Sequence, residues 1–148
     1  MRLWHKNLIS ILPREQLIAQ WRELSAIAGA IQKNGTPNHI LVNFVLDYDY
    51  DNFISYAKLV REELDKRNYK TMNSVWDKIT ALKPDWQLMK TEDIYFRKMN
   101  NFYYDVCLYN LMEKLNCGGV KEEPYRSLIM DAFVNREEFK NDVWRAAD

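Results

Sequence analysis

The stretch QLIAQWRELSAIAGAIQKNG, residues 16–35, constrains the fold most, because it carries one uninterrupted apolar helical face. Its apolar side chains recur at steps of three or four residues, the spacing of one face of an α-helix; they are Leu17, Trp21, Leu24, Ala28 and Ile31. Pro13 suits the first turn of a helix, and Asn34-Gly35 suits its C-terminal stop. The pattern predicts a helix over 14–33.

Helical periodicity also governs the rest of the chain. It predicts further helices over 50–68, 71–82 and 91–115, and one or two short ones at about 124–133 and 135–146. The segment 39–46 stays open between a buried helical turn and an extended piece, and no alternating strands joined by hairpin turns occur. A length of 148 residues is typical of one domain. We therefore predict an all-α fold, a single helical domain over 1–148 with about five or six helices.

The charge balance excludes a strongly basic nucleic-acid binder. The formal net charge is zero, whereas such proteins neutralise phosphates with an excess of cations. Residues 1–35 nevertheless carry five cations and only two acids, which is compatible with a local basic patch at the N-terminal end. No apolar run reaches the roughly 18 residues of a membrane span, the N-terminus lacks a signal-peptide pattern, and the two cysteines predict reduced thiols. We expect a cytoplasmic protein with no membrane partner.

Neither metal nor cofactor binding is predicted. The two histidines have no zinc-site spacing. Asp47, Asp49 and Asp51 alternate like the start of a calcium loop, but the positions that need Gly and Glu hold Asn52 and Lys58. The aspartates therefore indicate a carboxylate cluster before a helix, favoured by the helix dipole. No glycine-rich phosphate loop exists.

Arg22 and Glu23 stand side by side, away from the apolar stripe of the 14–33 helix. At about 100° per residue they fall on opposite flanks of its polar face. Glu23 shares its flank with Gln16 and Gln20. Periodicity alone predicts ordinary solvated charges here.

The segment QLIAQWREL…GAIQK, residues 16–33, together with the opening MRLWHKNLISILPREQL, resembles the pyrimidine-dimer DNA glycosylases, the phage endonuclease V-like family. The resemblance extends over about half the chain. It implies an all-α DNA repair enzyme that needs no cofactor or metal and acts as a monomer on double-stranded damaged DNA. Family members cleave the N-glycosidic bond of a pyrimidine dimer and then nick the backbone at the abasic site, as β-lyases.

The resemblance also implies the roles of individual residues. The nucleophile is the α-amino group, here that of Met1, which forms a Schiff base with the sugar, and Glu23 is the acid/base. An α-amine has a pKa of about 7.7–8.0, so part of it is neutral and nucleophilic at neutral pH. A carboxylate stabilises a cationic sugar transition state and can shuttle a proton. The DNA-binding residues that we expect are Arg2, Arg14, Arg22 and His39.

Departures from the family pattern keep two alternatives open. The family's histidine early in this helix is replaced by Gln16, and its further arginine by Ala26. One alternative is a non-catalytic helical relative that binds nucleic acid or protein. The other is a different chemistry on the same scaffold.

Overall fold

The computed structural model describes the backbone of residues 1–147 and the side chains of residues 1–137. Every regular element in this part of the chain is helical, and no strand occurs in it, which confirms the all-α prediction. In chain order the elements are η1 (Lys6–Ile11), α1 (Arg14–Asn34), η2 (Asn43–Asp47), α2 (Asp51–Lys66), α3 (Asn73–Thr80), η3 (Thr91–Asp93), α4 (Asn101–Asn116) and α5 (Tyr125–Ala147).

Helix α1 matches the predicted range of 14–33 almost to the residue. Its apolar stripe lies in the core, where Leu17 and Leu24 are fully buried, and each such leucine contributes about 1.5–3 kcal/mol on burial. Gly35 ends the helix with φ at +75°, and its N–H donates to Ile31 O at 2.8 Å. A left-handed residue at this position is the usual stop for a helix, and glycine adopts it without strain.

The acidic cluster stands where a helix begins, as predicted. Asp49 Oδ1 accepts the Asp51 N–H at 2.8 Å, at the start of α2. Lys83 Nζ pairs with Asp49 at 2.9 Å and with Asp51 at 3.0 Å. The segment 39–46, left open by the sequence, forms a turn followed by η2. It is therefore helical rather than extended, but only Val42 and Val45 in it are buried.

The prediction of one helix over 91–115 is wrong in its first part. Helix α4 begins only at Asn101, because Tyr95 and Arg97 adopt φ values of +50° and +78°, which a right-handed helix does not contain. A tertiary contact accompanies this turn: Asn52 Oδ1 accepts the Tyr95 N–H at 2.8 Å. Apolar periodicity carries no information about that contact.

The region 124–146, for which the sequence left one or two short helices open, forms one continuous helix, α5. No Gly or Pro stands between Tyr125 and Ala147 to interrupt it. Both cysteines are free thiols. None of the described helices combines the length and the apolar character that crossing a bilayer requires.

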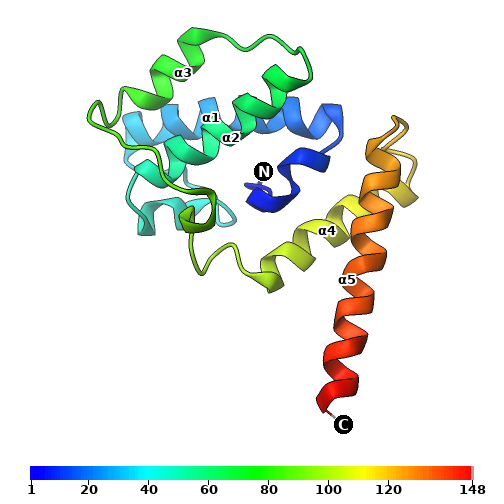
Figure 1. Ribbon diagram of the computed structural model, residues 1–148. Coiled ribbons are helices and arrows are strands. Elements are labelled where there is room, and N and C mark those ends of the chain that lie inside the picture. The colour runs from blue at the N-terminus through cyan, green and yellow to red at the C-terminus, as the bar shows by residue number, and fades with distance from the viewer. Residues whose placement is uncertain (148) are drawn as a thin grey trace.

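The short helix η1 lies among the larger ones. It packs against α2, α4 and α5, whereas α1 packs against α2 and α3. Figure 1 shows the N-terminal segment, in dark blue, between the α1–α2 pair and α4, with α5 running away from the rest of the molecule. The first residues of the chain therefore lie between α1 and α4.

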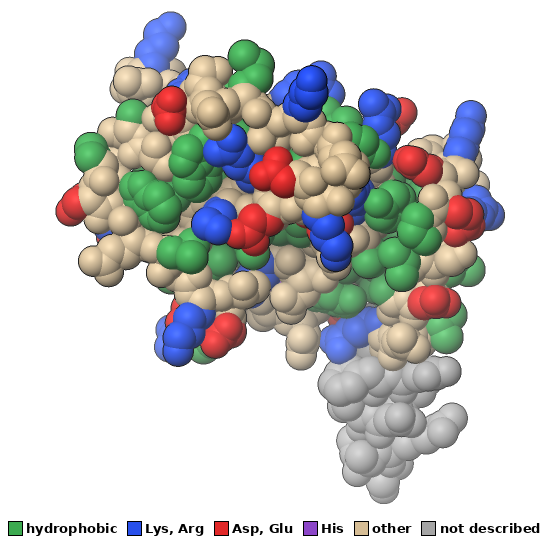
Figure 2. Space-filling view, turned by 45° about the horizontal axis from the view of Figure 1, so that its top comes forward, with side chains coloured by type: hydrophobic (Ala, Val, Ile, Leu, Met, Phe, Trp, Pro, Cys, Tyr) green, Lys and Arg blue, Asp and Glu red, His purple; other side chains and the backbone are tan. Residues whose placement is uncertain are grey.

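On the face drawn in Figure 2, Lys and Arg side chains are interspersed with Asp and Glu. No broad basic surface develops on this face, as a net charge of zero leads one to expect. On this face, the charges of Lys and Arg are therefore balanced locally by those of Asp and Glu.

Candidate active site at the first residues of the chain

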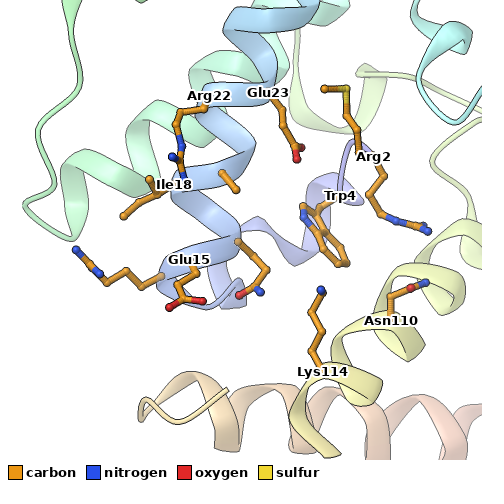
Figure 3. Close-up of a pocket in the computed structure, with 12 residues that line it drawn as sticks. Arg2, Trp4, Glu15, Ile18, Arg22, Glu23, Asn110 and Lys114 are labelled. Atoms are coloured by element: carbon orange, nitrogen blue, oxygen red, sulfur yellow. The ribbon is translucent and has the colours of Figure 1, made fainter. Parts of the chain in front are cut away.

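An open cleft of about 800 Å³ lies where the N-terminal segment passes between α1 and α4. Figure 3 shows Glu23 and Arg22 on α1, Arg2 and Trp4 on the N-terminal segment, and Lys114 on α4 around it. The residues predicted from the sequence that line the cleft are Met1, Arg2, Arg14, Arg22 and Glu23. The fold thus gathers five of the six predicted residues in one place.

Buried hydrogen bonds fix the chain immediately after Met1. The Tyr103 hydroxyl donates to Leu3 O. The Tyr56 hydroxyl donates to Trp4 O at 2.6 Å, and the Trp4 N–H donates to the side-chain oxygen of Gln20 on α1 at 2.8 Å. Because Leu3 and Trp4 are buried and bonded, these two residues have little rotational freedom. Met1 itself is about half exposed, at 48%.

His5 and Lys6, the next two residues, attach the N-terminal segment to the chain around residues 92–99. Lys6 Nζ donates to the carbonyl oxygens of Glu92 (3.0 Å) and Ile94 (2.6 Å). His5 Nδ1 accepts the Asn7 N–H at 3.1 Å, so Nε2 carries the proton that faces Met99 O at 2.9 Å. Burial lowers the pKa of the His5 imidazole. His5 and Lys6 are therefore structural anchors for the residues that form the cleft.

The Glu23 side chain differs from the periodicity-based prediction of a solvated charge. It is partly buried and faces the N-terminal segment across the cleft. Burial raises the pKa of its carboxyl group, and the positive charges of the Met1 amine, His39 and Arg22 oppose that rise. Among the ion pairs of the described residues none joins Glu23 to the Met1 amine. The two groups are therefore close enough to interact electrostatically but are not in direct contact.

Four cationic side chains line the cleft. Three were predicted, namely Arg2, Arg14 and Arg22, and the fourth is Lys114 of α4. Within the described part of the chain none of the four is in an ion pair with Asp or Glu. Arg2 lies over the Trp4 ring at 5.8 Å, and Arg14 over the Tyr69 ring at 5.5 Å. Unpaired cations in a concave site favour an anionic ligand.

His39, the sixth predicted residue, is not part of the cleft wall. It lies in the turn after α1, where its backbone N–H donates to Asn43 Oδ1 at 2.9 Å and its Nδ1 accepts the Leu41 N–H at 3.3 Å. When its imidazole is protonated, the positive charge lowers the pKa of the Glu23 carboxyl. His39 thus borders the site from outside.

Sequence reasoning missed several residues of the site. Lys114 and Asn110 line the cleft from α4, and no local pattern links them to residues so distant along the chain. Gln20 hydrogen-bonds to Glu23, and its place on the same helical flank was the one signal that could have revealed it. Trp4 forms a cleft wall and is 7% exposed.

The two positions that depart from the family pattern differ in their surroundings. Gln16 lines the cleft, and its buried Oε1 has no hydrogen-bond partner among the described residues. Ala26 is exposed on α1, outside the cleft wall. Within residues 1–137 no group of three His, Cys, Asp or Glu side chains is arranged to hold a metal ion.

Comparison with known proteins identifies a family. The sequence model of a family described as pyrimidine dimer DNA glycosylase matches residues 1–77. The match spans the N-terminal segment, α1, α2 and part of α3, so Lys114 and Asn110 lie beyond it. Neither a curated protein nor a solved structure matches the chain.

Proposed function

The chain belongs to the pyrimidine dimer DNA glycosylase family, and we propose that it is a DNA repair glycosylase with abasic-site β-lyase activity. Family membership itself implies a DNA repair glycosylase whose substrate is damaged DNA. The proposal adds that the Met1 α-amino group forms a Schiff base with the deoxyribose and that Glu23 serves as acid/base. The observation that carries it is the placement of the amine and a partly buried carboxylate in one cation-lined cleft.

The chemistry follows in two stages. The neutral Met1 nitrogen bonds to C1′ of the deoxyribose as the N-glycosidic bond breaks, and the base leaves with the electron pair of that bond. One proton then moves from the amine nitrogen to O4′ as the C1′–O4′ bond breaks, so the opened sugar carries a 4′ hydroxyl and is joined to Met1 as an iminium ion. Glu23 then accepts a proton from C2′, and the 3′ phosphate leaves by β-elimination. Water hydrolyses the imine and frees the amine.

The positions of the groups support these roles. The positive charge of the amine acts on Glu23, and the two groups line the same cleft without forming an ion pair. A carboxylate placed beside a developing cation stabilises it more strongly where water is partly excluded. Tyr56, Tyr103 and the other buried partners of residues 2–4 hold the amine's attachment point in advance of binding.

The cleft cations supply the affinity for DNA in this proposal. Arg2, Arg14, Arg22 and Lys114 neutralise backbone phosphates, and His39 faces the backbone from the rim. A few such contacts give moderate, salt-dependent binding. Four cations in one cleft are compatible with a chain of zero net charge.

Sodium borohydride trapping tests the proposal. With a duplex that carries one natural abasic site, the protein should form a covalent adduct that survives denaturing electrophoresis, because the imine is reduced to a stable amine. A duplex with a tetrahydrofuran site has no C1′ aldehyde and should give no adduct. A duplex with a single cyclobutane dimer should be nicked at the dimer without borohydride.

The alternative is a non-catalytic relative that binds nucleic acid or protein, and the exposed Ala26 in place of the family's arginine favours it. Salt-dependent binding of abasic duplex without adduct or nicking would establish this alternative and refute the proposal.

The Lys114→Gln variant should weaken binding to every duplex by a similar factor. Loss of one phosphate contact makes the slope of the log binding constant against log salt concentration less negative by about one. Fluorescence anisotropy between 50 and 200 mM salt, on damaged and undamaged duplexes, measures the slope. The control is Lys70→Gln, which removes an exposed lysine outside the cleft. If the salt dependence of binding has the same slope for both variants, Lys114 does not contact DNA.

A further inference from the structure

Gln20 lies behind the cleft wall, where it hydrogen-bonds to three residues that line the cleft, namely Arg2, Trp4 and Glu23. It is fully buried on α1. Its Oε1 accepts the Trp4 N–H at 2.8 Å and lies 2.8 Å from the Tyr56 hydroxyl, whose proton it shares with Trp4 O. Its Nε2 donates to Arg2 O at 3.0 Å and to Glu23 Oε2 at 3.1 Å. An amide has two donor hydrogens and two acceptor lone pairs, so nothing remains unused.

These contacts permit only one orientation of the Gln20 amide. Turning it over would set its NH₂ group against the Trp4 N–H, which can only donate, and its oxygen against Arg2 O and the Glu23 carboxylate, which accept. The Nε2–H bonds therefore always point at Arg2 O and Glu23. One rigid side chain joins the backbone beside Met1 to the carboxylate.

We propose that Gln20 is a positioning residue that ties the first residues of the chain to Glu23 and thereby sets the separation of the Met1 amine and the Glu23 carboxylate. The catalytic consequence rests on the proposed function. The structural consequence is that the hydrogen bond from Gln20 Nε2 favours the ionised form of Glu23, and this does not depend on the proposed function. Errors of about 1 Å in such a separation cost around 100-fold in rate.

Other groups also act on Glu23. The charged groups that face it are the Met1 amine from the N-terminal segment, Arg22 from its own helix and His39 from the turn after α1. From α2 the neutral Tyr56 hydroxyl lies on the far side of Gln20. Burial raises the pKa of the Glu23 carboxyl, and the Gln20 N–H offsets part of the cost of burying the charge.

The Gln20→Glu variant tests the proposal. It keeps the shape of the side chain, removes the N–H donor and sets a second carboxyl beside Glu23, so the pKa of Glu23 should rise by about one unit or more. Gln20→Met removes the N–H donor without adding a charge, and it replaces Gln20→Glu in the test if that variant does not fold. Turnover of abasic DNA should fall at least about ten-fold with little change in KM, and the acid limb of the rate profile should move to higher pH.

Tyr56→Phe is the matched control, because it removes a hydroxyl from the same buried network without touching Glu23. It should lower the midpoint of thermal unfolding yet leave the acid limb in place. Carbon-13 NMR titration of the Glu23 carboxyl measures the effect of Gln20 on the Glu23 pKa directly and does not require an active enzyme. If Gln20 variants that fold keep the wild-type Glu23 titration, or Tyr56→Phe shifts it equally, the positioning role is refuted. A wild-type protein with no lyase activity but a Gln20-dependent Glu23 titration would refute only the proposed function.

Discussion

Blocking the Met1 α-amino group should abolish borohydride trapping on abasic DNA. Acetylation turns the amine into an amide whose nitrogen lone pair is delocalised and no longer nucleophilic, and added residues carry the amine away from the cleft. Removing the nucleophile of a covalent mechanism typically costs a factor on the order of 10³ or more. Adduct yield per unit time, for protein with a two-residue Gly-Ser extension before Met1, measures the effect.

The same Gly-Ser extension placed after the C-terminus is the matched control and should leave the adduct yield unchanged. Both proteins should bind the tetrahydrofuran duplex within a few-fold of each other, since only one amine is displaced among several cleft cations. Mass spectrometry of the trapped protein locates the bond. Lys114 is another amine that lines the cleft, and an adduct on Lys114 rather than on the peptide Met1-Arg2 would assign the nucleophile to α4.

Local sequence determined α1 because one segment contains all the information needed. The apolar stripe, Pro13 and Gly35 lie within one contiguous stretch, and burial of that stripe against α2 and α3 agrees with its propensity. Segment 91–100 shows the opposite case. There Lys6 and Asn52 bind backbone groups from far away in the sequence, and these contacts override a pattern that favours helix.

The residues of the site also fall into those predictable from local sequence and those that depend on tertiary packing. Met1, Arg2, Arg22 and Glu23 were found because a family motif lies in the first part of the chain, not because periodicity distinguishes them. Periodicity assigned Glu23 to solvent, whereas in the structure it is partly buried and faces the N-terminal segment. Lys114 reaches the cleft through the packing of η1 against α4, which no short stretch of sequence encodes.

The Glu23→Gln variant should lose lyase turnover by about 10²–10⁴-fold, the usual contribution of a general acid/base. Glutamine keeps the shape and can still accept the Gln20 N–H through its amide oxygen, but it cannot take the C2′ proton. Single-turnover cleavage of abasic duplex measures the loss. The control is Glu62→Gln, an exposed carboxylate on α2 whose ion pair is with Lys58, and its rate should match the wild type.

The pH profile separates this role from a structural one. Burial raises the pKa of Glu23, and the reaction needs the ionised form, so wild-type activity should fall as pH drops through a pKa that is higher than that of an exposed glutamate. A raised folded-state pKa also means that the native protein holds this proton more tightly than the unfolded chain. The ionised group therefore costs stability at neutral pH, and that cost disappears below the unfolded value. Glu23→Gln should thus be at least as stable as the wild type at pH 7 while being inactive. A variant that is slow only because it is less folded, or one that keeps the acid limb of the wild type, would show that Glu23 is not the catalytic carboxylate.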